Sequence, residues 1–239
     1  MPGTGSTSSI SITISTPRGP VRGQWRPASV TRAAAILLPD TPGVLGDPFH
    51  LFDELAVRIQ RSGASVLQLE QSADTFDGRL VCLLSALTAL RRQGVQRMAL
   101  IGWHSGAALA IAAGSASESV TGVAALAPDT SCADLVAEVA PRRLLLMHGS
   151  ADNVVPSVAS RLLYAHAADP KELVIFPGES HDFSVFHQEA LDKLTVWTRA
   201  LLRSPFKPRK LRREIADAAD VDAEAPHTQD AEVALPSAL

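Results

Sequence analysis

The sequence has few cysteines, no long apolar run and no excess of positive charge. Each of these three absences excludes a class of protein. Its two cysteines, Cys82 and Cys132, form no metal-binding spacing and lie in apolar surroundings. We therefore expect them to be buried and reduced, as in a cytoplasmic protein. No apolar run approaches the length of a membrane span. The N-terminus, MPGTGSTSSISITIST, lacks the basic start and apolar core of a secretory signal.

The charge balance gives no sign of a polyanionic partner. A net charge of −3 over 239 residues offers no reason to expect binding to nucleic acid or to an anionic membrane. A chain of this length suffices for one large α/β domain with a substantial core. We expect the partner to be a small-molecule substrate or ligand, and the sequence implies no cofactor. The oligomeric state is left open.

Periodicity predicts a short hairpin followed by a regular alternation of strands and helices. The expected strands are 11–16, 21–27, 33–38, 64–69, 97–102, 119–128, 142–149 and 171–176. The expected helices are 48–63, 76–94, a run of small residues after Gly106, 157–168 and 181–203. This alternation indicates an α/β fold with a mostly parallel central sheet and helices on both faces. In such sheets functional groups gather at the carboxyl ends of the strands.

A single folded domain is expected over 10–203, and its central strands should form the core. Residues 1–9 and 204–239 are expected to be disordered, because they lack a sustained apolar face. A basic cluster at 207–213 is either a docking patch or part of a solvated tail. The residues expected to be buried in central strands are Leu37, Leu38, Leu100, Ile101, Ala125, Leu145, Leu146 and Ile175.

The turn after strand 97–102 reads GWHSG, and its central residue is a histidine. In a strand–turn–helix of the G-x-S-x-G type the central serine is a nucleophile, and small residues stand two places before and after it. Gly102 and Gly106 fit this spacing only around His104. A turn centred on Ser105 would put Trp103 in a tight position, so the spacing selects His104. We expect His104 to have a positive φ.

Two further strand ends are followed by polar residues, first an aspartate and then a histidine. HGSADNVVP places Asp152 after one strand, and FPGESHDF places His181 after the next. With the turn at His104 and the alternating elements, these loops resemble those of the α/β-hydrolase superfamily, especially its dienelactone-hydrolase-like branch. The superfamily has the chain order nucleophile, acid, histidine. The resemblance covers about residues 10–203 and implies a small-molecule ester or lactone hydrolase.

The resemblance also implies roles for individual residues. It makes Asp152 the acid that orients His181, and His181 the base. The backbone N–H of Ser105 would be one oxyanion donor, and Thr41 could supply the second from the loop after strand 33–38. In that loop Pro42 has no N–H, and an ionised Asp40 near the site would oppose an oxyanion. The connection 129–141 is too short for a lid domain.

Four readings of the site remain open. A water activated by His181 could attack a reactive ester or lactone without an acyl-enzyme. Two imidazoles and a carboxylate could instead shuttle protons in a lyase, cyclase or isomerase. The chain could also be a pseudoenzyme that binds a ligand or partner, since His104 supplies no nucleophilic oxygen or sulfur. Finally, His104 and His181 could hold a metal with Asp152 as an outer partner, but the sequence reveals no third protein ligand, and we therefore expect no metal site.

Overall fold

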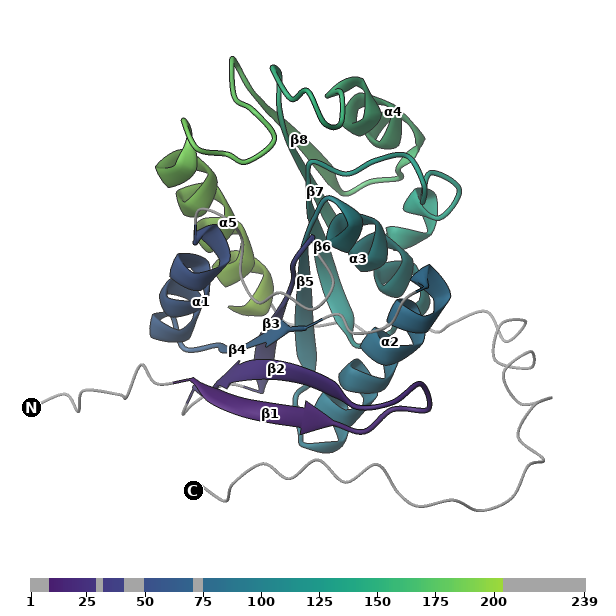
Figure 1. Ribbon diagram of the computed structural model, residues 1–239, viewed down its shortest axis with the longest axis vertical. Helices are drawn as coiled ribbons and strands as arrows, with labels where there is room; N and C mark the ends of the chain where they lie inside the picture. Colours follow the sequence, from purple (N-terminus) through teal and green to yellow (C-terminus); the bar gives the residue numbers. More distant parts are fainter. Residues whose placement is uncertain (1–8, 29–31, 41–49, 71–74, 204–239) are drawn as a thin grey trace, which may run out of the picture.

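The protein is built on one central sheet. The computed structural model describes residues 9–28, 32–40, 50–70 and 75–203, and these form a sheet of eight strands in the order β1-β2-β4-β3-β5-β6-β7-β8 (Figure 1). The strands are β1 (Ile10–Ile14), β2 (Val21–Arg26), β3 (Ala33–Leu38), β4 (Ser65–Leu69), β5 (Arg97–Trp103), β6 (Val120–Leu126), β7 (Arg143–Gly149) and β8 (Lys171–Phe176).

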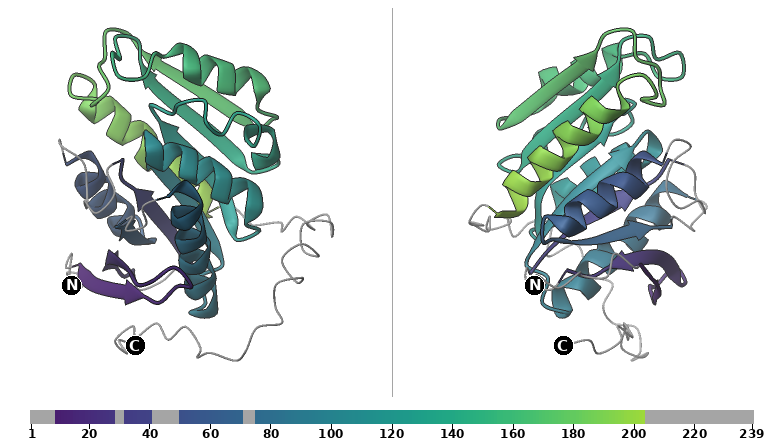
Figure 2. Two further views of the ribbon diagram at one scale, coloured as in Figure 1. Left: turned by 45° about the vertical axis from the view of Figure 1, so that its right-hand side comes forward. Right: turned by 90° about the vertical axis from the view of Figure 1, so that its left-hand side faces the viewer.

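The sheet is antiparallel only at its β1–β2 end. β1 pairs antiparallel with β2, and β2 pairs antiparallel with β4, whereas all pairs from β4 to β8 are parallel. Figure 2 shows this hairpin at one end of the twisted sheet and β8 at the other. Because the six parallel strands end at one edge, their carboxyl ends bring the following loops together.

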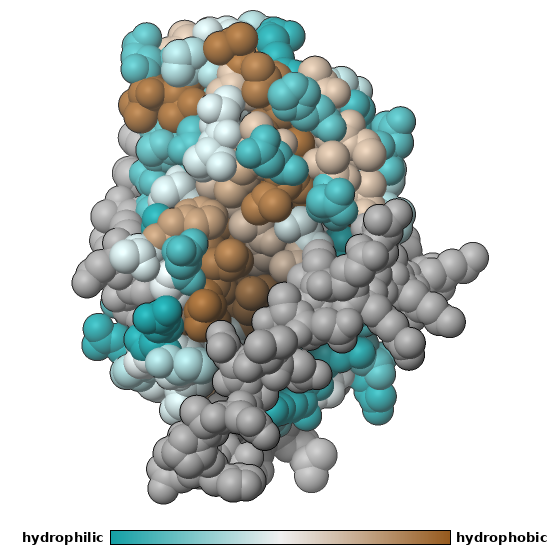
Figure 3. Space-filling view, turned by 90° about the vertical axis from the view of Figure 1, so that its right-hand side faces the viewer, coloured by the Kyte–Doolittle hydropathy of each residue, from teal (hydrophilic) through white to brown (hydrophobic). Residues whose placement is uncertain are grey.

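Helices cover both faces of the sheet, as the sequence predicts. α1 and α5 lie on one face, and α2, α3 and α4 lie on the other (Figure 1). Figure 3 looks onto the second face, where polar and apolar residues are mixed. The helices are α1 (Leu51–Arg61), α2 (Phe76–Arg92), α3 (Ser105–Ala116), α4 (Val158–His166) and α5 (His187–Arg203), with a short 3₁₀ helix η1 (Val136–Val139) between β6 and β7.

The composition of the central strands follows from this two-sided burial. In β3, Ile36 and Leu38 belong to the apolar cluster beneath α2 and α3, whereas Ala35 and Leu37 belong to the cluster beneath α1 and α5. Successive side chains of a strand point to opposite faces, so a strand covered on both faces needs a continuous apolar run. AAAILL is such a run, and all of its residues are buried.

Two sequence predictions about the core and the last helix need correction. Seven of the eight expected core residues are fully buried, but Ile175 is only half-buried. β8 is an edge strand with β7 as its one sheet neighbour, so its residues are less enclosed. The closing helix was expected from residue 181, but α5 begins at His187. The segment before it is a loop that carries His181.

The connection between β6 and β7 contains turns and η1, and it packs onto the domain instead of forming a lid. Val136 and Val139 of η1 are buried in the cluster that includes α3. Within the part of the chain that the structure describes, no helix is both long and apolar enough to cross a bilayer. The tail at 204–239, residues 1–8 and Thr41 lie outside the described residues, so the expectations about them stay predictions.

Candidate active site

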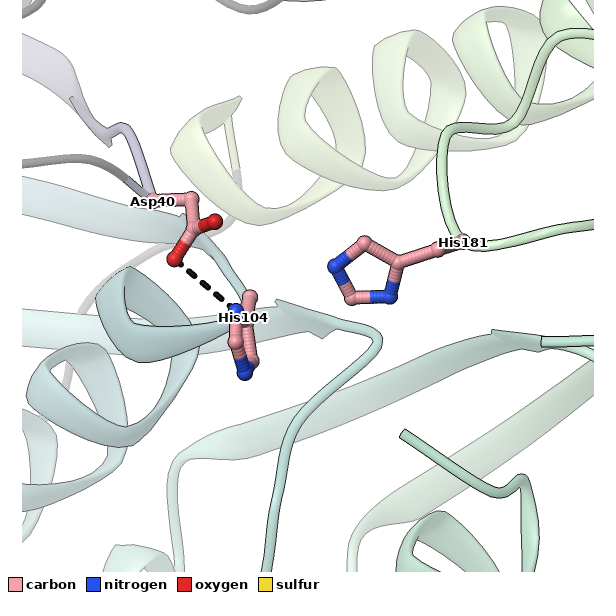
Figure 4. A group of neighbouring side chains, drawn as sticks. All are labelled: Asp40, His104 and His181. Carbon is pink, nitrogen blue, oxygen red and sulfur yellow. Dashed lines mark ion pairs between the residues drawn. The ribbon is translucent and has the colours of Figure 1, made fainter. Parts of the chain in front are cut away.

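Polar side chains follow the carboxyl ends of four parallel strands and converge at one edge of the sheet. Asp40 follows β3, and His104 follows β5. Asp152 and His181 follow β7 and β8. Figure 4 shows the side chains of Asp40, His104 and His181 pointing toward a common space from three different segments. Strands β3 and β5 are hydrogen-bonded neighbours, which places Asp40 beside the turn at His104.

The turn between β5 and α3 has the tight backbone that its glycines suggest. His104 has φ 49° and ψ −111°, so the expected positive φ is observed. A Cβ on Gly102 would collide with the backbone of Gly106, and one on Gly106 would collide with the backbone of Leu38. The chain therefore leaves β5 and enters α3 with room for a side chain only at the residues between the two glycines.

Asp152 holds His181 in one orientation. Oδ2 of Asp152 lies 2.7 Å from Nδ1 of His181. Its other oxygen, Oδ1, accepts the backbone N–H groups of Val154 and Val155, each at 2.8 Å. Burial alone would raise the pKa of Asp152, but these hydrogen bonds from His181, Val155 and Val154 outweigh it and hold the pKa below its ordinary value. The carboxylate is therefore ionised and keeps the proton of neutral His181 on Nδ1.

Because Asp152 engages Nδ1, Nε2 is the nitrogen of His181 that is available to react. It is buried and has no hydrogen-bond partner among the described residues. The ring of His181 lies 5.0 Å from that of His104 between centroids, at an interplanar angle of 88°, and 5.9 Å from the ring of Trp103. A neutral imidazole with a bare Nε2 can accept a proton or bind a cation.

A third histidine, His148, also contacts Asp152. Its side chain is fully buried, and its Nε2 donates to the carbonyl of Val155 at 2.8 Å and lies 3.2 Å from Oδ2 of Asp152. Its Nδ1 therefore accepts a hydrogen bond from Oγ of Ser160, 2.7 Å away on α4. Burial, before all other causes, lowers the pKa of His148, so the ring is neutral. The sequence analysis missed this residue, although a histidine ending the apolar run RLLLM was a visible signal.

Asp40, which the sequence analysis considered only as a charge that would oppose an oxyanion, contacts both His104 and Ser105. Its Oδ1 lies 2.9 Å from Nδ1 of His104, although the two atoms do not form an aligned hydrogen bond. The same oxygen accepts the backbone N–H of Ser105 at 3.4 Å, and the carbonyl of Asp40 accepts Oγ–H of Ser105 at 2.6 Å. Ser105 begins α3, and a carboxylate is favoured at the positive end of a helix dipole.

These contacts occupy the hydroxyl and the backbone N–H of Ser105. Its hydroxyl donates to Asp40 and accepts from Nη1 of Arg79 on α2 at 3.3 Å. Its N–H, expected to stabilise an oxyanion, faces the carboxylate of Asp40. A developing oxyanion at this N–H would meet a negative charge.

Asp40, His104 and His181 form a possible metal-binding group within the described part of the chain. One ligand atom from each lies within 4.8 Å of the other two. Asp40 is the third residue with a potential ligand atom, which the sequence did not reveal. Asp152, on the far nitrogen of His181, is in the position of an outer partner to such a site.

The loop that carries His181 is organised by Glu179, whose side chain is fully buried. Its carboxylate accepts the backbone N–H groups of Ser180, Val185 and Phe186 at 2.8, 3.3 and 2.5 Å. These bonds turn the chain between β8 and α5 and explain why the helix begins only at His187.

An open groove elsewhere on the described surface is separate from this site. It lies between the β1–β2 hairpin and α2, and shares no residue with the histidine cluster. Its lining includes Ser15, Pro17, Val81, Leu84, Thr88 and Arg92.

Solved structures with the same architecture identify the fold. The α/β hydrolase GrgF from Penicillium sp. sh18 superposes with a TM-score of 0.73 over 82% of this chain and 100% of that chain, at 15% identity. The chain has the α/β-hydrolase fold. Dienelactone hydrolase from Anabaena variabilis superposes with a TM-score of 0.73, over 82% of this chain and 99% of that chain, at 16% identity.

A third neighbour with the α/β-hydrolase fold also lacks a lid. It is a serine hydrolase from Xanthomonas campestris, with a TM-score of 0.69 and 22% identity over 84% of this chain and 98% of that chain. At these identities the likeness establishes the fold and not the activity.

Sequence relatives match only a small part of the chain. The uncharacterised protein YfhR of Escherichia coli (strain K12) is 46% identical over 46 residues, which are 19% of this chain and 16% of that protein. The protein of the same name from Salmonella typhi is 37% identical over 67 residues, 28% of this chain and 23% of that protein. The chain thus matches less than a quarter of the length of these relatives. No protein-family model matches it.

Proposed function

We propose that this chain hydrolyses a small-molecule ester or lactone with water as the nucleophile and without an acyl-enzyme. The observation that carries the proposal is Nε2 of His181, which is buried, without a hydrogen-bond partner among the described residues, and fixed as an acceptor by Asp152. The spacing of Gly102 and Gly106 favours His104 as the counterpart of the α/β-hydrolase nucleophile, and a histidine has neither a hydroxyl nor a thiol. The hydroxyl of Ser105 donates a hydrogen bond to the backbone carbonyl of Asp40.

In this mechanism His181 acts first as a base and then as an acid. Nε2 takes a proton from water while the water oxygen bonds to the carbonyl carbon of the substrate. The bond from that carbon to the leaving oxygen then breaks, and the same proton passes from Nε2 to that oxygen, which leaves as the alcohol. Asp152 stabilises the imidazolium between the two steps. Ester and water give acid and alcohol, and no bond to the protein forms.

The test is hydrolysis of a chromogenic short-chain ester and a small lactone by the purified full-length chain. We expect turnover that falls at least about 100-fold in His181→Ala, since general acid–base assistance is worth 10²–10⁴-fold. His166→Ala, which changes an exposed histidine at the end of α4, should leave it unchanged. A fluorophosphonate probe should not label the protein. Labelling of Ser105, or turnover that does not depend on His181, would contradict the mechanism.

A ligand-binding role without hydrolysis is the second candidate. It is favoured by Asp40, whose carboxylate lies at the N–H that would stabilise an oxyanion. Absence of turnover by a folded protein with any of the tested esters and lactones would support this candidate. Proton transfer as in a lyase, cyclase or isomerase would use the same pair, His181 and Asp152.

A further inference from the structure

We infer that Asp40, His104 and His181 bind a divalent transition-metal ion, with Zn²⁺ as the ion of reference. The ligand atoms of these residues come from three segments and lie within 4.8 Å of one another. Two imidazole nitrogens and a carboxylate oxygen suit Zn²⁺ and its first-row neighbours, whereas Mg²⁺ and Ca²⁺ prefer oxygen ligands alone. Three protein ligands leave coordination positions for water and substrate, as catalytic metal sites require.

The distances fit a common centre. Ligand atoms bonded to one ion at about 2.0–2.1 Å stand about 2.9–3.4 Å apart for angles between 90° and tetrahedral. Nδ1 of His104 and Oδ1 of Asp40 already lie 2.9 Å apart. From the 4.8 Å limit, an approach of about 1.4 Å at most brings the three ligand atoms into one sphere, and the torsions of Asp40 and His104 can supply it while Asp152 holds His181.

Two nitrogens of the cluster lack a hydrogen bond within the described part of the chain, whereas Oδ1 of Asp40 accepts the N–H of Ser105. Nδ1 of His104 and Nε2 of His181 are both buried, and neither has a hydrogen-bond partner in the described residues. A buried polar nitrogen without a partner costs free energy, and a cation between the two removes that cost. Figure 4 shows the nitrogen of His181 that is turned toward Asp40 and His104.

The charges around the cluster also favour a cation. Asp40 is itself a proposed ligand and carries a carboxylate. The carboxylate of Asp152 lies 2.7 Å from Nδ1 of His181 and increases the electron density of that ring. Carboxylates bound to the outer nitrogen of a ligating histidine fix its tautomer and raise its basicity. The arrangement Asp152–His181–ion is of this kind. The cation Arg79 on α2 contacts Oγ of Ser105.

The catalytic consequence of this inference rests on the proposed function, but ion binding itself does not. With an ion bound, Nε2 of His181 is a ligand and no longer the base. Asp40, His104 and His181 would hold the ion, which would supply an activated water and a Lewis acid in place of the N–H of Ser105 that Asp40 already engages. The overall reaction would remain hydrolysis of an ester or lactone to an acid and an alcohol.

The test is titration of Zn²⁺ into the chelator-treated full-length protein by isothermal calorimetry. We expect one ion per chain and an at least about 100-fold weaker affinity in each of Asp40→Ala, His104→Ala and His181→Ala. Asp152→Asn should weaken binding about 10–100-fold, the usual effect of losing an outer partner. His166→Ala is the matched surface control and should bind as the wild type does. Circular dichroism confirms that each variant is folded.

The results separate this inference from the proposed function. No binding by the wild type, or equal binding by folded ligand variants, overturns the metal site. Hydrolysis that persists after chelation would then still support His181 as a base. Binding that follows the three ligands without any hydrolysis supports the metal site and overturns the proposed activity.

Discussion

Two carboxylates, Asp40 and Asp152, lie beside imidazoles at this edge of the sheet, but their surroundings give them different chemistry. Asp152 is fully enclosed and satisfied by His181 and two backbone N–H groups. Asp40 is 38% exposed at the side chain and faces His104 and the N–H of Ser105. The first therefore orients the ring of His181, whereas the second adds negative charge at the N–H of Ser105.

This difference predicts what is required to restore serine-hydrolase chemistry. In chelated buffer, His104→Ser should raise ester hydrolysis at least about tenfold, because His181 can serve the new hydroxyl as a base. Adding Asp40→Asn should give a further gain of about 10–100-fold, since it removes the charge at the N–H of Ser105. Initial rates with a chromogenic ester measure both steps. A third change, His181→Ala, should abolish the gain, and a folded double variant no faster than wild type would refute this account.

His148 predicts how stability depends on pH. Its pKa is lowered in the folded protein, so the unfolded chain binds its proton first as the pH falls. The free energy of unfolding should decrease as the pH falls below about 6.5, by up to about 1.4 kcal/mol per pH unit from this one group. Asp152, whose pKa is also lowered, adds a second decrease below about pH 4.

Urea denaturation at a series of pH values measures both decreases. His148→Gln keeps a donor toward Val155 and should lose most of the slope between about pH 5 and 6.5, at the cost of lower stability at pH 7. A slope equal to that of the wild type would show that another group titrates there.

At the scale of elements, the turn between β8 and α5 determines where His181 lies. Its conformation depends on Glu179, because one buried carboxylate accepts three backbone N–H groups. Gly149 at the end of β7 makes room for it, since a Cβ there would collide with the carbonyl of Glu179. The loop therefore packs closely against the end of β7, the adjacent parallel strand. Asp152 lies in the segment that follows β7.

Replacing the carboxylate should therefore disturb both stability and the site. Glu179→Ala leaves buried N–H groups without an acceptor and should destabilise the protein by about 3 kcal/mol or more, since hydrogen bonds to a charged group are worth about 1.5–3 kcal/mol each. Glu179→Gln retains one acceptor oxygen and should lose less. Chemical denaturation measures stability, and Zn²⁺ titration reports the position of His181. An alanine variant as stable as the glutamine variant would contradict this role.

The elements were more predictable than the contacts between them. Strand and helix periodicity is local, so the parallel sheet and the tight turn at His104 followed from the sequence. The start of α5 did not, because Phe183 and Phe186 have helical spacing while Glu179 binds the N–H groups that a helix would use. Ile175 was misjudged because a sequence does not reveal which strand forms the edge of the sheet.

The site was predicted only where motifs carry it. His104, Asp152 and His181 could be found from their strand ends, and they converge in the structure. The contact of Asp40 with His104 depends on β3 lying beside β5, and strand order is not local information. His148 was missed for a similar reason, because its partner Ser160 is on α4. The catalytic and oxyanion roles, that of Thr41 included, stay predictions.

For the whole molecule, the described residues complete a sheet covered on both faces, with one apolar cluster on each side. The sequence after Arg203 has no sustained apolar face. We therefore predict that removing residues 204–239 changes the melting temperature by no more than about 2 °C, because the deletion should expose no core. Differential scanning calorimetry of the shortened and full chains tests this, and a larger drop would show that the tail packs on the domain.

The left-handed backbone of His104 bears on why this residue is there at all. A residue other than glycine at φ 49° and ψ −111° carries a strain of about 1–3 kcal/mol. Glycine tolerates such angles freely, so a glycine at this position would fold without that strain. The imidazole beside Asp40 and His181 is therefore held in place at a cost in stability.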